Sequence, residues 1–491
     1  MSRRTIIKRS ILVVLIAALA YGVRYAWVSF PIISGFGAKN LCSCMFVGGR
    51  SEKSVKEEEL ADSPLPLGKF VVDEKDSSVT GTVFGLAKRK AIYRKGLGCT
   101  LVNDVTETAI RSQHFATAVA PSLNTDTITW PSGDAAWEKT EIMGHFANTL
   151  QRSKRNEGFH ILTDVSKGDM PAGINRQQLQ QAVQSAFEET DPKKKIITRA
   201  VVVVYDGKLV AEQYAPGYDK HSKMLGWSMG KSITAALIGI LVKEGKLNTA
   251  APAPVPEWQD ANDPRHAITL ENLLQQTSGL NYVEDYTKAS EATDMLFKKG
   301  DMAAYVAGLP AKDKPGTLFY YSSGNSNILS RIIRATTGEA AYHQFPAKAL
   351  FFKIGMYNTI LEPDASGTFV GSSYPWATAR DWARFGLLYL NDGVWNGERI
   401  LPEGWVQKTR TPVMADKQRH YGYQFWMNGV EEKDPAKHIY PGVPTDMYNA
   451  DGYGGQEVYI IPSRKLVIVR LGLHKHDEMK LLTGILNALP H

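Results

Sequence analysis

The chain is poor in cysteine, and this scarcity limits both metal binding and covalent cross-linking. Its 491 residues include three cysteines, Cys42, Cys44 and Cys99. No zinc pattern of cysteines and histidines accompanies them, so we expect no metal site. A bridge between Cys42 and Cys44 would be strained, given the Cα spacing that disulfides prefer. Two alternatives remain: one of these two cysteines pairs with Cys99, or all three are unpaired buried thiols.

Acidic residues are missing from the first twenty positions, which contain Arg3, Arg4, Lys8 and Arg9. The apolar run 11–23 follows, with Ala18-Leu19-Ala20 as a candidate small-residue cleavage site. This pattern is typical of an export signal, either a cleaved signal peptide or an uncleaved membrane anchor over residues 1–30. The positive flank stays inside, so we expect an exported protein that is periplasmic or anchored to the inner membrane facing the periplasm.

The rest of the chain has no strong excess of either charge. The four N-terminal basic residues account for more than half of the formal net charge of +7, and the remaining +3 gives no support for a nucleic-acid partner. With 43% hydrophobic and 22% charged residues, the composition is that of a globular protein large enough for more than one unit.

Residues 31–180 contain no recognisable chemical motif. Short β-like runs alternate there with glycine, proline and serine. We expect an N-terminal accessory region of unknown role, either a membrane-proximal spacer or a lid. The motifs described below lie in a second region, which we assign to residues 181–491.

Two hairpins are predicted at opposite ends of residues 181–491. Runs 199–205 and 208–212 flank the Asp206-Gly207 turn, and runs 457–461 and 466–470 flank a second turn. Amphipathic or apolar helices are predicted over 176–189 and 479–489. We therefore predict an α+β fold, in which an antiparallel β-sheet built from both ends of the catalytic domain is flanked by helices and accompanied by a helical subdomain.

Ser228-Met229-Gly230-Lys231 is the most informative motif of the chain. On a helix, Ser228 and Lys231 share one face. A serine hydroxyl needs a neighbouring base to act as a nucleophile, and a lysine amine serves as one when it is buried. A serine at a helix start also lies near backbone N–H groups that stabilise an oxyanion.

Two further stretches contain candidate catalytic groups. Tyr321, before a predicted helix, can relay a proton between Lys231 and a leaving group, although most tyrosines in such clusters are structural. Glycine-rich residues 450–456 precede the second hairpin. Glycines beside a strand allow close backbone approach, and the backbone N–H of Tyr453 is a candidate second oxyanion donor.

In their order along the chain, these three stretches resemble the serine hydrolases related to class C β-lactamases. That family includes D-Ala-D-Ala carboxypeptidases, esterases and the 6-aminohexanoate-dimer hydrolase. The resemblance covers residues 195–490 and extends through residues 273–280, 315–317, 377–381 and 455–456. It implies that Ser228 is acylated, that Lys231 is its base, that Tyr321 is the catalytic tyrosine, and that the N–H groups of Ser228 and Tyr453 form the oxyanion hole.

Two departures from the β-lactamases bear on the substrate. Ser323 stands in place of the asparagine of Tyr-x-Asn, and Ala450-Asp451-Gly452 stands in place of Lys-Thr-Gly. Asp451 would repel a substrate carboxylate if it faced the pocket. Both changes argue against β-lactamase activity as the main role and weaken the peptidoglycan carboxypeptidase alternative. The Ala-x-Gly-x-Gly-Gly-Gln form of residues 450–456 and the stretch 279–286 are more similar to the 6-aminohexanoate-dimer hydrolase branch. We assign Ser323, Asp451 and Gly452 to substrate binding, together with the aromatic side chains Trp227 and Tyr282.

The sequence therefore predicts a serine hydrolase that acts through an acyl-enzyme on the amide or ester bonds of small linear substrates and needs no cofactor. The alternatives are an esterase, a peptidoglycan D,D-peptidase or β-lactamase-like enzyme, and, from another class, a catalytically silent binding protein. The expected partners are a small-molecule substrate and, if the N-terminal segment is uncleaved, a membrane.

Overall fold

The computed structural model describes residues 3–135, 171–191 and 193–490. The chain forms two compact units. Unit 1 comprises residues 1–113, 282–306 and 363–367, and unit 2 comprises residues 114–281, 307–362 and 368–491. Two segments from the C-terminal half of the chain therefore belong to the same unit as its N-terminal residues.

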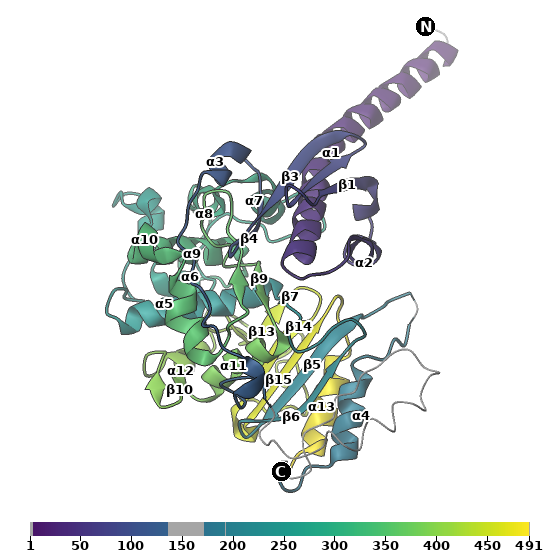
Figure 1. Ribbon diagram of the computed structural model, residues 1–491. Helices are drawn as coiled ribbons and strands as arrows, with labels where there is room; N and C mark the ends of the chain where they lie inside the picture. Colours follow the sequence, from purple (N-terminus) through teal and green to yellow (C-terminus); the bar gives the residue numbers. More distant parts are fainter. Residues whose placement is uncertain (1–2, 136–170, 192, 491) are drawn as a thin grey trace, which may run out of the picture. The chain divides into compact units, whose positions relative to one another are not determined.

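Unit 1 combines a long N-terminal helix with a small antiparallel sheet (Figure 1). The strands are β1 (Gly68–Asp73), β2 (Ser78–Val83), β3 (Leu86–Arg94) and β4 (Gly98–Leu101), paired in that order. The helices are α1 (Arg3–Phe46), α2 (Glu52–Glu57), α3 (Glu107–Arg111) and α7 (Glu291–Lys298), and α8 (Met302–Ala307) ends at the boundary with unit 2.

Helix α1 has two halves of different character. The side chains of residues 6–7 and 9–25 are exposed, whereas those from Ile33 to Cys44 are mostly buried in unit 1. Within the described part of the chain, one helical stretch, Arg9–Phe46, is long and apolar enough to cross a membrane, a property that signal sequences share. A disulfide joins Cys42 of α1 to Cys99 of β4, with the Cα atoms 6.1 Å apart, which confirms one of the two alternatives for the cysteines.

Unit 2 is built on a six-stranded antiparallel sheet of order β12-β13-β14-β15-β5-β6. Its strands are β5 (Thr198–Tyr205), β6 (Lys208–Tyr214), β12 (Trp426–Met427), β13 (Tyr448–Gly452), β14 (Gln456–Ile461) and β15 (Leu466–Gly472). Both predicted hairpins form, and β15 pairs directly with β5. The sheet is thus assembled from both ends of unit 2, which confirms the predicted α+β fold.

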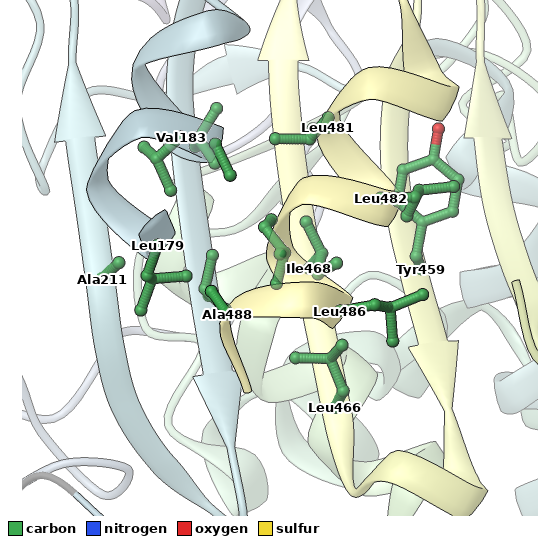
Figure 2. Close-up of a cluster of buried hydrophobic side chains, with 14 of the residues drawn as sticks. Leu179, Val183, Ala211, Tyr459, Leu466, Ile468, Leu481, Leu482, Leu486 and Ala488 are labelled. Atoms are coloured by element: carbon green, nitrogen blue, oxygen red, sulfur yellow. The ribbon is translucent and has the colours of Figure 1, made fainter. Parts of the chain in front are cut away.

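Helices cover both faces of this sheet. On one face, α4 (Arg176–Ser185) and α13 (Glu478–Ala488) bury leucines and valines against β14, β15 and β5 (Figure 2). On the other face lies α11 (Ala379–Leu390), whose Gly386 lies so close to β14 and β15 that an added Cβ would be 2.5 Å from Val467. Thr378 caps α11 by accepting a hydrogen bond from the N–H of Asp381 at 3.0 Å.

The remaining elements of unit 2 lie mostly between β6 and β12 in the sequence. Its other helices are α5 (Gly230–Lys243), α6 (Leu270–Leu274), α9 (Ser323–Thr337), α10 (Glu339–Tyr342) and α12 (Trp405–Thr409). Short strands β7 (Met224–Leu225), β8 (Ile360–Leu361) and β9 (Pro375–Ala377) form one small sheet, and β10 (Val394–Trp395) pairs with β11 (Glu398–Arg399). The helices α5, α6 and α9 form the predicted helical subdomain.

Candidate active site

Ser228 lies in a single 3-10 turn, η3 (Trp227–Met229), directly before α5. The turn is held by two backbone hydrogen bonds, from Gly226 N–H to the Pro375 carbonyl at 2.8 Å and from Met229 N–H to the Gly226 carbonyl at 3.1 Å. Trp227 adopts φ +46°, a left-handed conformation that costs about 1–2 kcal/mol for a residue with a side chain. This cost and the fixed turn indicate that the position of Ser228 is tightly determined.

Lys231 lies on the first turn of α5 with its side chain buried. Its ammonium donates to three uncharged oxygens: Ser228 Oγ at 2.9 Å, Ser323 Oγ at 3.0 Å and the Ser372 carbonyl at 3.0 Å. The Ser372 backbone is itself held in place, because its N–H donates a hydrogen bond to Asn327 of α9 at 3.2 Å. Three acceptors satisfy the three donors of an ammonium and aim one of its protons at Ser228.

Tyr321 and Ser323 reach the same lysine from the start of α9. The Lys231 Nζ lies 4.8 Å from the centre of the Tyr321 ring, within the range of a cation–π contact. The Tyr321 ring is itself packed on Trp426 and Tyr421, at centroid distances of 5.1 Å and 5.9 Å. Four residues chosen from the sequence, Ser228, Lys231, Tyr321 and Ser323, are therefore brought into contact.

The end of β13 approaches the Ser228 turn. A Cβ atom added to Gly452 would lie 2.3 Å from the Gly226 carbonyl oxygen, so only glycine fits there. The Tyr453 ring stands edge-on to the Trp227 ring at 5.7 Å and is largely exposed. Among the described residues, β12 pairs only with Tyr448 and Asn449, which leaves the same edge of β13 without a strand partner over residues 450–452.

Two buried side chains fix the turn that follows β13. The Arg470 guanidinium on β15 donates to the carbonyls of Gly454 at 3.0 Å and Gly455 at 2.9 Å. The Gln456 side-chain amide donates to the Tyr453 carbonyl at 3.2 Å. Because these bonds hold the peptide groups on both sides of the turn, they restrict the orientation of the Tyr453 backbone.

Asp451 is directed to the α13 face of the sheet. It pairs with Glu457 of β14, so the two side chains lie on the same face of the sheet. Tyr459, two residues further along β14, also lies on this face and donates a hydrogen bond to Glu478 of α13 at 3.1 Å. A side-chain hydrogen bond joins the two carboxyls. Burial raises the pKa of both carboxyls, and the Asp451 charge raises the pKa of Glu457 further. The Asp451 carboxyl is thus engaged by Glu457, and its assignment to substrate binding stays a prediction.

Tyr282 belongs to unit 1, unlike the other residues selected from the sequence. Its side chain is buried there, its hydroxyl contacts Met295 Sδ at 3.8 Å, and burial raises its pKa. The role in substrate binding that we assigned to Tyr282 stays a prediction.

A buried network of side-chain amides supports α9 and was not predicted. Asn325 accepts from Ser278 at 2.8 Å and donates to Gln276 at 2.8 Å, and Gln276 donates to Gln424 at 3.2 Å. Gln424 also accepts from Ser326 of α9 at 2.7 Å. Gln276 and Ser278 lie in the 273–280 stretch of the resemblance, but nothing in the sequence connects that stretch to Gln424. In the part of the chain that the structure describes, no three His, Cys, Asp or Glu residues are grouped as metal ligands.

A serine and a tyrosine that both contact one buried lysine, on an α+β scaffold, define a class of protein, the serine hydrolases. Comparison with known families agrees with this class. The sequence model of the Beta-lactamase family matches residues 178–481, so the chain belongs to that family and is a serine hydrolase.

One sequence relative and two solved structures illustrate what the chain is similar to. The 6-aminohexanoate-dimer hydrolase of Paenarthrobacter ureafaciens is 25% identical over 300 residues, which cover 56% of this chain and 72% of that enzyme. Among solved structures, a penicillin-binding protein homologue from Caulobacter crescentus superposes with a TM-score of 0.52 at 15% identity, covering 66% of this chain and 99% of the homologue. A family VIII carboxylesterase superposes with a TM-score of 0.51 at 16% identity, covering 64% and 98% of the two chains. At these identities, the two structures establish the fold alone.

Proposed function

We propose that the protein hydrolyses amide or ester bonds of small linear substrates through an acyl-enzyme on Ser228. The observation that carries this proposal is the 2.9 Å hydrogen bond between Lys231 Nζ and Ser228 Oγ, made by a lysine that is buried. In its neutral form the same amine accepts the Ser228 proton as Oγ attacks the substrate carbonyl carbon. The charge on the tetrahedral oxygen is then stabilised by backbone N–H groups, for which we propose Ser228 and Tyr453.

The remaining steps follow from the same contacts. The C–N or C–O bond breaks as the leaving group takes a proton from Lys231 or Tyr321, and Ser228 is left as an acyl ester. Water attacks this ester, its proton passes to Lys231 or Tyr321, and the Ser228 oxygen recovers a proton as the acid leaves. Ser323 acts as a positioning residue, because its Oγ accepts a hydrogen bond from the Lys231 ammonium at 3.0 Å.

One feature supports a substrate without a recognition carboxylate like that of β-lactams: Ala450 stands where the β-lactamases have the lysine that attracts this carboxylate. The Asp451 carboxyl is bonded to Glu457 on the α13 face of the sheet, so repulsion by Asp451 does not enter this argument. The similarity to an enzyme named for hydrolysis of the 6-aminohexanoate dimer favours linear amides among the candidates.

Mass spectrometry of the intact protein tests the mechanism directly. We would incubate it with p-nitrophenyl esters, a linear amide dimer and a cephalosporin, and map any acyl adduct. The expected result is an adduct on Ser228 that is absent in Ser228→Ala and present in Ser232→Ala, a control variant that loses a buried serine of α5. No adduct with any compound would favour the silent binding protein, and fastest turnover of the cephalosporin would favour a β-lactamase.

We also propose that α1 is an uncleaved anchor. Its exposed apolar half continues without a break into residues that are buried in unit 1 and joined to β4 by the Cys42–Cys99 disulfide. N-terminal sequencing of the protein from a carbonate-washed membrane fraction tests this: an intact N-terminus is expected, whereas a start after the 18–20 segment would contradict it.

A further inference from the structure

The β2–β3 turn of unit 1 exposes large apolar side chains beside the point where α1 enters the unit. Phe84 is 70% exposed and Leu86 is 61% exposed, although both are side chains that proteins usually bury. Phe84 also adopts φ +50°, a left-handed turn conformation that glycine or asparagine would occupy at lower cost. An exposed aromatic residue in a costly conformation indicates a function outside the core of unit 1.

This turn is fixed to α1 rather than loosely placed. The Phe84 ring stands edge-on to the Phe30 ring of α1 at 5.7 Å. One turn further along α1, the Ser34 hydroxyl donates to the Ala87 carbonyl at 2.5 Å. A Cβ atom on Gly81 of β2 would lie 2.4 Å from the Ser34 carbonyl, so strand and helix are in direct contact. The turn therefore has a defined height along α1.

That height coincides with the edge of a bilayer spanned by α1. From Ile6 to Trp27 an α-helix rises about 32 Å, and the hydrocarbon core of a bilayer is about 30 Å thick. Trp27 is 84% exposed and Tyr25 is exposed beside it, as expected of aromatic residues at a membrane interface. Phe30 lies only about 5 Å further along the helix, so the turn that contacts Phe30 is level with the interface.

We propose that the β2–β3 turn is a second membrane contact, in which Phe84 and Leu86 insert into the boundary between lipid headgroups and acyl chains. The occupant is the lipid bilayer itself, and the proposal rests on the anchor role of α1 proposed above. Lys88, which follows the turn and is exposed, is placed to meet lipid phosphates. Together, helix and turn give unit 1 two points of attachment and a fixed tilt on the membrane surface.

Fluorescence quenching by spin-labelled lipids tests the proposal on the full chain in vesicles. The environment-sensitive fluorophore NBD is attached at Phe84→Cys or, as a matched control, at Lys75→Cys in the exposed turn at the other end of β2. The native cysteines do not interfere, since Cys42 and Cys99 form a disulfide and Cys44 is buried. We expect about twofold quenching at position 84 by lipids with a nitroxide near the headgroup, and little at position 75.

Each other outcome overturns the proposal in a recognisable way. Unquenched NBD at both positions, in protein that floats with the vesicles, would refute the turn contact and leave the anchor intact. Equal quenching at both positions would mean that the whole sheet lies on the bilayer. A blue-shifted but unquenched signal at position 84 would indicate contact with protein instead of lipid. Protein that fails to float would refute the anchor and the turn contact together.

Discussion

Substituting alanine for Gly452 should move the end of β13 away from η3, the turn that contains Ser228. The new Cβ atom would lie 2.3 Å from the Gly226 carbonyl oxygen, about 1 Å closer than normal contact allows. Neither side yields easily, because Gly226 is held by its hydrogen bond to Pro375 and β13 is paired with β14. The end of β13, and with it the Tyr453 backbone, must therefore move away from Ser228 by about that distance.

The expected loss follows from this displacement. A misplacement of about 1 Å costs about 100-fold in rate, close to the loss of one oxyanion donor. At 1.36 kcal/mol per tenfold change, this amounts to about 2.7 kcal/mol of transition-state stabilisation. The overlap should also lower the free energy of unfolding by about 1–3 kcal/mol, as overpacking does elsewhere.

The assay is kcat/KM with a p-nitrophenyl ester, measured well below the Tm of each variant. Gly239→Ala is the matched control, because its Cβ would lie 2.7 Å from the Trp405 ring, in the middle of α5. Both variants should lose stability, but only Gly452→Ala should lose about two orders of magnitude in kcat/KM. Equal losses in the two variants, or a Gly452→Ala enzyme within threefold of wild type, would refute the reasoning.

Three further changes test other parts of the site. Lys231→Met keeps the volume of the side chain but removes the base, so kcat/KM should fall by at least about 1,000-fold and the ester adduct on Ser228 should disappear. Arg470→Met should lower kcat by about tenfold or more with little change in KM, because the turn bearing Tyr453 loses two carbonyl contacts. The folded-state pKa of Glu457 is raised, so its contribution to stability is greatest at pH values below its unfolded pKa of about 4.3 and is lost as pH rises through the folded pKa. The Tm of the wild type should therefore decline with rising pH over this range. Thermal denaturation of Glu457→Gln should show a weaker decline.

Each of these expectations has a result that contradicts it. Persistent acylation in Lys231→Met would assign the base elsewhere. A rise in KM at constant kcat in Arg470→Met would mean that the arginine serves substrate binding and not the transition state. A Tm profile that is the same for Glu457→Gln and wild type would show that the pair with Asp451 is not the group that titrates.

Local sequence patterns were sufficient for much of the fold. Runs rich in β-branched residues on both sides of Asp206-Gly207 and of residues 462–465 specify hairpins, since turn type and register are set within a few residues. The motif at Ser228 and Lys231 could also be recognised from the sequence, because its two members are only three positions apart. Tyr321 and the glycine-rich segment were identified through their order in the chain and the family resemblance.

Contacts between distant segments were decided only by the tertiary structure. The contacts of the Ser372 carbonyl, Gln424 and Arg470 come from segments far from Ser228 in the sequence. The spacing of residues along the chain does not predict them. The direction of Asp451 was open in the sequence, because the face that a strand side chain occupies depends on the register with its neighbour, here Glu457. The sequence by itself thus determined which chemistry the chain can perform, and the packing of remote elements decided how that chemistry is held in place.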